Sequence, residues 1–282
     1  MFITLYNYLI FYAYLCHSKT IEKQIIMIEP RPLILVTNDD SIAAPGLLRL
    51  VDCLPQDADI IVVAPAEQHS GQSSAITVGR PLFIRAHDDY RGARLFSIGG
   101  TPVDCVKLAM SAIVPRRPTL VLAGINHGSN SGCNVIYSGT MGAVLEGCTY
   151  GITSCGFSIL NHSLDADFSA TMPFIKDIVA DLLTEPLPAG ICLNVNMPAR
   201  EAPLGVRACR AARGHWTDEY DRYTDPMGNP FFWLTGRFVN EEPDATDTDE
   251  YWLNRNYISV VPVRGDMTAM NYISTTSKRF DR

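Results

Sequence analysis

Apolar runs of strand length alternate with segments of helical periodicity through the first part of the chain. The first run, residues 33–37, ends in the Asn-Asp-Asp of residues 38–40. Leucine and valine then recur at the i, i+3, i+4, i+7 spacing of an amphipathic helix within residues 45–54, and residues 59–65 form a second apolar run that ends at proline. Strand, helix and strand in this succession predict a βαβ unit and therefore a parallel sheet.

Similar runs continue toward the C-terminus. We expect further strands at residues 75–78, 82–86, 94–98, 119–123, 152–159 and 191–197, and helices at about residues 101–113, 141–150 and 169–183. After Pro198 the chain becomes rich in Gly, Pro, Asp and aromatic residues, with strand-like runs near 230–235 and 257–263. The pattern predicts a Rossmann-like α/β fold, a doubly wound and mostly parallel sheet, followed by an extended β-hairpin arm.

Length and composition limit the classes of function. With 282 residues, the chain suits one large α/β domain or a domain with an appended subdomain. Its net charge of −7, without a block of Lys or Arg, argues against a nucleic-acid polymer as partner. The eight cysteines are scattered without a CxxC pair, which predicts reduced thiols in a cytoplasmic protein. We also expect no membrane partner.

Residues 1–30 are interpreted as an N-terminal extension that precedes the domain. Residues 2–15 form an apolar, aromatic run that is short for a membrane span and lacks the basic start of a signal peptide. Because Met27 lies just before the first core strand, we interpret residues 1–26 as a mis-assigned start or a dispensable extension. The predicted divisions are then the extension (1–30), a catalytic core (31–200), and an arm and tail used for oligomerisation (201–282).

Polar oxygen donors follow several of the predicted strands. Asp39 and Asp40 end the first strand, Ser70 lies in the polar loop after the second, and Asn126 follows the run at 119–123. In an open α/β sheet the carboxyl ends of the strands form the ligand-binding edge. Two carboxylates with hydroxyl and amide oxygens suit a hard cation such as Mg²⁺ or Mn²⁺. The alternative interpretation is helix capping and turn formation, which applies most strongly to Ser70 and Asn126 taken singly.

Other catalytic templates do not fit. The chain has no G-x-S-x-G nucleophile motif, no G-x-G-x-x-G and no Walker A lysine motif, which argues against a serine hydrolase, a dinucleotide cofactor and an ATP motor. An aspartyl-phosphate mechanism is nearer, because its nucleophile also follows a first strand. That mechanism needs a second acid two residues after the nucleophile, and Ser41 occupies this position relative to Asp39.

Several ordered motifs resemble the SurE family, the survival-protein-E 5′/3′-nucleotidases. The similarity covers roughly residues 31–273 and is carried by the segments at 35–46, 63–71, 100–105, 124–126, 137–140 and 225–229. The resemblance implies a metal-dependent phosphatase that acts on nucleoside monophosphates, with a C-terminal arm that assembles a homodimer or homotetramer. It also implies that Asp39, Asp40, Ser70 and Asn126 are the ligands of one divalent ion.

One position departs from the family pattern. The family usually reads Asn-Asp-Asp-Gly, and Ser41 replaces the glycine. If this position needs a positive φ, serine would cost on the order of 1 kcal/mol there and could tilt the two carboxylates.

The predicted function is hydrolysis of nucleoside 5′- and 3′-monophosphates to nucleoside and phosphate. Asp39 and Asp40 would be the catalytic carboxylates that hold the ion, and Ser138, Gly139 and Thr140 at a helix start would cradle the phosphate. The open alternatives are a phosphatase for another phosphoester or short polyphosphate, and a nucleotide-binding sensor without turnover. Asp104 fits a helix start and is interpreted as structural.

Overall fold

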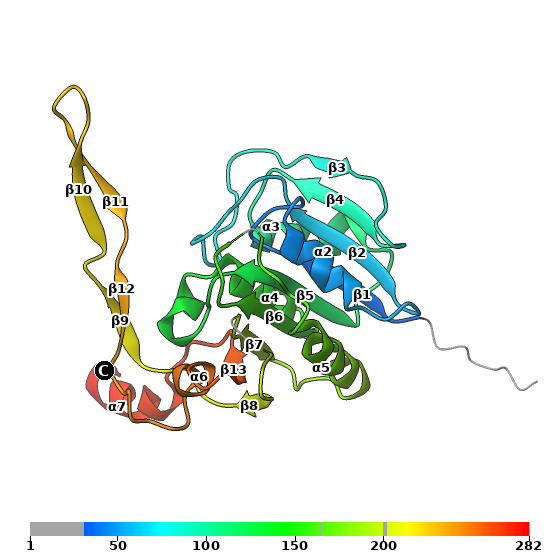
Figure 1. Ribbon diagram of the computed structural model, residues 1–282. Helices are drawn as coiled ribbons and strands as arrows, with labels where there is room; N and C mark the ends of the chain where they lie inside the picture. Colours follow the sequence, from blue (N-terminus) through cyan, green and yellow to red (C-terminus); the bar gives the residue numbers. More distant parts are fainter. Residues whose placement is uncertain (1–30, 164, 200–201, 282) are drawn as a thin grey trace, which may run out of the picture. The chain divides into compact units, whose positions relative to one another are not determined.

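A nine-stranded sheet organises the part of the chain that the structure describes. The computed structural model describes residues 31–163, 165–199 and 202–281. The strands of this sheet are β1 (Leu33–Thr37), β2 (Asp59–Pro65), β3 (Ile84–Ala86), β4 (Arg94–Ile98), β5 (Leu120–His127), β6 (Thr153–Ile159), β7 (Ile191–Met197), β8 (Val206–Ala208) and β13 (Ile258–Arg264). Their spatial order is β3-β4-β2-β1-β5-β6-β7-β13-β8 (Figure 1).

The chain winds outward from β1 in both directions. The neighbours β1–β2, β2–β4, β1–β5, β5–β6 and β6–β7 are parallel, whereas β3 and β13 run antiparallel to β4 and β7. The connection after β1 leads to β2 on one side, and β5 lies on the other side. The strand order therefore reverses between β1 and β5, which is where ligands bind in doubly wound sheets. The predicted Rossmann-like, mostly parallel fold is confirmed.

Helices cover both faces of the sheet because alternate residues of β1 point to opposite faces. Ile34 and Val36 pack with α2 (Pro45–Asp52) and α5 (Met172–Thr184). Leu33 and Leu35 pack with α3 (Pro102–Leu108) and α4 (Gly139–Thr149). A π-helical turn, η1 (Ala109–Ile113), continues α3. A strand buried from both sides needs the continuous apolar run that the sequence shows at 33–36.

The predictions for residues 75–78 and 119–123 differ from the structure, the first in secondary structure and the second in where the strand ends. Residues 75–78 form no strand, because their backbone groups bond to the start of α3: Thr101 Oγ1 donates to the carbonyl of Ala75, and Thr77 N–H donates to the Asp104 carboxylate. The strand predicted at 119–123 continues as β5 to His127, with an irregularity between Ala123 and Asn126. Asn126 therefore lies inside a strand and not in a loop.

The strand-like run at 257–263 is also placed differently from the prediction. It forms β13, which joins the central sheet beside β7, and β8 joins the same edge. The arm itself consists of two antiparallel pairs, β9 (Gly214–Thr217) with β12 (Arg237–Asn240) and β10 (Tyr220–Thr224) with β11 (Pro230–Leu234) (Figure 1). The chain continues through α6 (Asp249–Leu253) and β13 to η3 (Met270–Tyr272) and α7 (Ile273–Phe280).

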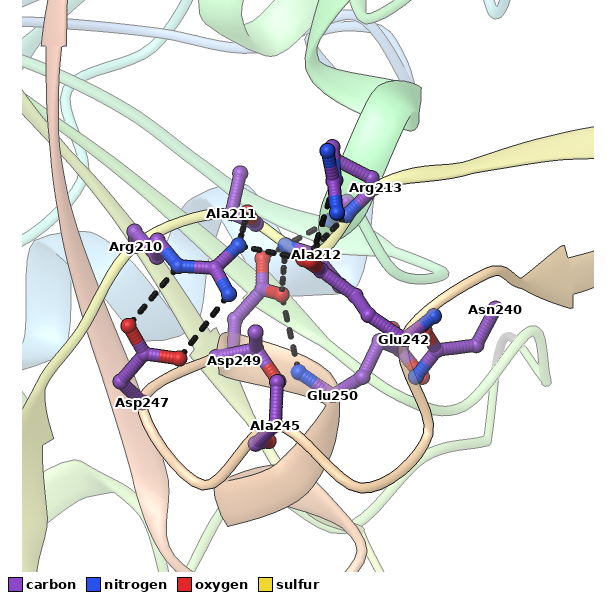
Figure 2. Close-up of polar contacts among 12 residues, drawn as sticks. Arg210, Ala211, Ala212, Arg213, Asn240, Glu242, Ala245, Asp247, Asp249 and Glu250 are labelled. Carbon is purple, nitrogen blue, oxygen red and sulfur yellow. Dashed lines mark hydrogen bonds and ion pairs between the residues drawn. The ribbon is translucent and has the colours of Figure 1, made fainter.

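A polar cluster holds the base of the arm (Figure 2). Arg210 donates to both carboxylate oxygens of Asp247 at 2.9 Å and also contacts Glu242. Hydrogen bonds from Arg210 and Arg213 lower the pKa of Glu242 to about 2. Asp249, which is fully buried, accepts hydrogen bonds from the backbone N–H of Ala212 and of Glu250 at 2.8 Å. The entry to the arm is therefore fixed to α6 by charge-assisted hydrogen bonds.

The interpretation of residues 1–30 as an N-terminal extension lies outside the described residues. Within residues 31–163, 165–199 and 202–281, none of the helices has the length and apolar character needed to cross a membrane.

Candidate functional site

The two adjacent carboxylates lie where β1 leaves the sheet, beside the reversal of strand order. Ser41, which follows them, has a φ of 95°. This is the positive φ at which serine, in place of the family's glycine, is expected to be strained. Asn38 Nδ2 donates to the carbonyl of Ser41 at 2.8 Å and holds the turn. The Oδ1 atom of Asn38 is buried and accepts no hydrogen bond within the described residues.

Asp40 connects the ends of β1, β2 and β5. Its Oδ2 accepts a hydrogen bond from the backbone N–H of His127, the residue after Asn126, at 3.1 Å. Gln68 Nε2 donates both to Asp40 Oδ1, at 3.4 Å, and to Ser70 Oγ, at 3.0 Å. The loop that carries Ser70 is also joined to the end of β1, because His69 N–H donates to the carbonyl of Asp39 at 2.7 Å. These bonds bring the Ser70 loop and the Asn126 strand to the paired aspartates.

Asp39 is buried against the first turn of α4. Only 3% of its surface is exposed, and Thr140 Oγ1 donates to its Oδ1 at 2.5 Å. Burial raises the pKa of Asp39 to about 6; the hydrogen bond from the Thr140 hydroxyl acts against this rise, and the neighbouring Asp40 carboxylate adds to it. Gly139 makes the close approach possible, because a Cβ there would lie 2.9 Å from both Cβ and Oδ2 of Asp39.

Asn126 occupies the irregular end of β5. Its Nδ2 donates to the carbonyl of Gly128 at 2.8 Å, and no hydrogen bond to its Oδ1 occurs within the described part of the chain. Gly46 in α2 packs directly on this segment, since a Cβ there would lie 2.1 Å from the carbonyl oxygen of Ile125. The irregular backbone leaves an amide oxygen available to a ligand at the strand end.

The residues predicted to cradle a phosphate start α4. Ser138 is its N-cap, and its Oγ accepts a hydrogen bond from the N–H of Met141 at 3.0 Å. The Thr140 hydroxyl donates to Asp39 and is fully buried. Both hydroxyls are thus engaged within the protein, and so are the backbone N–H groups of Met141, which bonds to Ser138, and of Thr140, which bonds to Asp39. The group of the first turn that suits an anion is therefore the backbone N–H of Gly139.

These donors fit a hard divalent ion. Within the described residues, no Lys, Arg or His side chain forms an ion pair with Asp39 or Asp40. The same part of the chain contains no group of three or more His, Cys, Asp or Glu side chains that could bind a metal. The donor set therefore depends on amide and hydroxyl oxygens beside two carboxylates, as Mg²⁺ and Mn²⁺ prefer.

Two supporting residues were missed by the sequence reasoning. Gln68, which links Asp40 to Ser70, lies in a polar loop where nothing distinguishes it from its neighbours. Asn38 belongs to the Asn-Asp-Asp segment but was not assigned a role, although its side chain braces the turn. Its position directly before two carboxylates at a strand end is the signal that could have identified it.

The fold and site together define an α/β protein with clustered oxygen donors and a helix N-terminus at the carboxyl edge of a mostly parallel sheet. The model of the family described as Survival protein SurE matches residues 34–218. The chain belongs to this family, which confirms the resemblance found in the sequence.

Named relatives and a solved structure agree with this assignment. The 5′-nucleotidase SurE of Christiangramia forsetii is 48% identical over 256 residues, covering 89% of this chain and 98% of the relative. That of Phocaeicola vulgatus is 48% identical over 243 residues, covering 86% and 95%. The crystal structure of the SurE protein from Aquifex aeolicus has 31% sequence identity and a TM-score of 0.75, covering 88% of this chain and 99% of that one.

Proposed function

We propose that this protein is a metal-dependent 5′-nucleotidase that also accepts 3′-mononucleotides, releasing inorganic phosphate from nucleoside monophosphates. Family membership supports the reaction class, since the two relatives described above are named 5′-nucleotidases. The site supports metal dependence: a buried carboxylate stands beside a second one, and no cationic side chain of the described residues pairs with either. These two adjacent carboxylates, Asp39 and Asp40, are the single observation that carries the proposal.

The roles follow from the contacts at the site. Asp39 and Asp40 would hold a Mg²⁺ or Mn²⁺ ion, and Ser70 Oγ and Asn126 Oδ1 would complete its protein ligands. When bound, such an ion supplies positive charge to the phosphate oxygens and lowers the pKa of water. The Thr140 hydroxyl fixes the orientation of Asp39, and the His127 N–H fixes that of Asp40. The N–H of Gly139 would bind the phosphate at the start of α4.

Assembly and cellular compartment are proposed on separate observations. Every residue of β10 and β11 is exposed, including aromatic side chains such as Phe232 and Trp233. An exposed apolar hairpin of this kind supports use of the arm in a homodimer or homotetramer. The seven cysteines of the described residues are all free, which supports a reducing compartment such as the cytoplasm.

Phosphate release from a panel of 5′- and 3′-mononucleotides, with chelator or with added Mn²⁺ or Mg²⁺, tests the proposal. We expect turnover only with metal and a loss of about 10²-fold or more in Asp39→Asn, because the variant removes one charge at the site. Asp177→Asn, at an exposed carboxylate on α5, is the matched control and should retain activity. Turnover that persists in chelator, or in Asp39→Asn, would contradict the proposal.

A second candidate is a nucleotide-binding sensor, and the backbone at Ser41 favours it. A φ of 95° is unfavourable for serine, and the strain lies next to the paired aspartates. Binding of mononucleotides without phosphate release in the wild type, with turnover restored in Ser41→Gly, would support the sensor over the enzyme.

A further inference from the structure

Two exposed apolar residues stand directly before the proposed phosphate cradle. Ile136 is 60% exposed and Tyr137 is 57% exposed, and Ser138, the N-cap of α4, follows them. Within the described residues, the Tyr137 ring contacts no other aromatic ring and its hydroxyl makes no hydrogen bond. Adjacent large apolar side chains that are exposed to solvent beside a polar site can mark a surface that binds a ligand.

Their exposure is not the result of a loose loop. Tyr137 N–H donates to the carbonyl of Asn134, and the carbonyls of Ile136 and Tyr137 accept hydrogen bonds from Ser73 Oγ, at 2.6 Å, and from Ser73 N–H, at 3.0 Å. Val135, between Asn134 and Ile136, packs against the buried cluster that α3 and α4 form with the sheet. The backbone is therefore held on both sides while the two side chains face outward.

The base of the arm fixes the turn that carries Ile136 and ends directly before Tyr137. This turn, η2 (Gly132–Ile136), begins where Gly132 N–H donates to the buried Asp249 carboxylate at 2.8 Å, and Trp216 Nε1 of β9 donates to Asn134 Oδ1 at 2.7 Å. Asp249 belongs to the cluster drawn in Figure 2. Tyr137 is thus presented by a preorganised turn, which lowers the entropy that a ligand would lose on contact.

The distance along the chain matches the size of a nucleotide. Tyr137 is two residues from Gly139, so their Cα atoms lie within about 7 Å of each other. Gly139 packs against Asp39 at the site proposed for the phosphate. In a nucleoside 5′-monophosphate, one ribose separates the phosphate from the base, so a base can reach the Tyr137 ring while its phosphate lies at the start of α4.

We propose that Tyr137, supported by Ile136, is the platform on which the nucleobase of the substrate stacks. This inference rests on the proposed nucleotidase function and adds the residue that distinguishes nucleotides from phosphomonoesters without a base. Aromatic rings stack on every base, so the platform favours the class of nucleoside monophosphates without selecting one base. Because the base takes no part in bond breaking, stacking lowers KM and leaves kcat unchanged.

Steady-state kinetics on the full chain test the platform with three substrates: adenosine 5′-monophosphate, uridine 5′-monophosphate and ribose 5-phosphate. Tyr137→Ala should raise KM for both nucleotides by about ten- to hundredfold, with kcat retained. It should change the kinetics of ribose 5-phosphate by less than about twofold, and Tyr137→Phe should behave as the wild type. Tyr150→Ala, at the opposite end of α4, is the matched control and should leave all three substrates unaffected.

The outcomes separate this inference from the function on which it rests. If the wild type releases phosphate from none of the three substrates, the proposed function fails. If it hydrolyses all three but Tyr137→Ala affects nucleotides and ribose 5-phosphate equally, the platform is wrong and the phosphatase stands. Loss of oligomeric state in Tyr137→Ala, measured by light scattering, with nucleotide preference intact, would assign the pair to a contact between copies and also overturn the platform.

Discussion

Replacing Ser41 by glycine tests whether strain is stored beside the paired aspartates. A φ of 95° costs an L-residue about 1–2 kcal/mol, which glycine avoids. The turn cannot relax easily, because the Ser41 carbonyl accepts hydrogen bonds from Asn38 Nδ2 and Ala44 N–H, and Ile42 N–H donates to the carbonyl of Pro65. Glycine loses more backbone entropy on folding, about 0.5–1 kcal/mol. We therefore expect Ser41→Gly to raise the free energy of unfolding by about 0.5–1 kcal/mol.

Urea unfolding followed by circular dichroism measures this difference, and thermal unfolding should show a rise of about 1–4 °C in Tm. Ser74→Gly is the matched control, since Ser74 lies in an exposed loop and its φ is outside the left-handed region. There the entropy loss acts alone, so the free energy of unfolding should fall by about 0.5–1 kcal/mol. If Ser41→Gly loses as much stability as Ser74→Gly, position 41 stores no strain and the reasoning is refuted.

The same variant also measures what the strain does to the site. If serine tilts the carboxylates, Ser41→Gly should show higher kcat/KM for mononucleotides than the wild type. Equal kcat/KM in the two proteins, with Ser41→Gly the more stable one, would mean that the turn absorbs the strain without moving Asp39 or Asp40.

Two further predictions concern other contacts of the same edge. Gly139→Ala places a Cβ 2.9 Å from Cβ and Oδ2 of Asp39 and should reduce phosphate release by about 10²-fold. Gly99→Ala, whose Cβ would lie in open space, is the control and should retain the rate of phosphate release. Equal activity of the two variants would show that Asp39 can move away from the added Cβ. Burial acts to raise the pKa of Asp104, but hydrogen bonds from Thr77 and Thr101 outweigh it and hold the pKa below 3.8. Its contribution to stability is therefore complete above pH 3.8 and is lost as the pH falls through the lowered pKa. In urea unfolding between pH 2.5 and 7, the advantage of the wild type over Asp104→Asn should shrink below pH 3.8, and an advantage independent of pH would contradict this assignment.

The sequence predicts best where one physical rule acts alone. The buried parallel strands β1 and β2 are largely continuous apolar runs, and the structure places them at the predicted bounds. The strands β6 and β7, which also carry serine or asparagine, lie within one residue of their predicted bounds. The start of α3 was also predicted correctly: Thr101 and Asp104 form a capping box, in which each side chain accepts the other's backbone N–H.

The sequence predicts poorly where a backbone bonds to distant side chains. Residues 75–78 carry a strand-like pattern, yet the Thr77 N–H bonds to Asp104, 27 residues away, and no pattern local to the segment contains this partner. Asn126 was identified by residue type but was predicted to follow the strand and not to lie in it, because the continuation of β5 through Gly124 depends on its neighbour β6. Gln68 was missed for the same reason, since its role depends on where two other segments meet.

The opposing effects on the charged form of Asp39 connect the fold to the proposed metal binding. Removing this carboxylate from water is unfavourable, and the adjacent Asp40 adds repulsion. The fold opposes these terms with the Thr140 hydroxyl at Asp39 and the His127 N–H at Asp40. These contacts are not sufficient, because the pKa of Asp39 remains raised to about 6. A divalent ion would supply the positive charge that the described side chains do not, and in binding to the folded chain it would stabilise it. Asp39, whose burial as a carboxylate is unfavourable, is therefore well placed to hold such an ion together with Asp40.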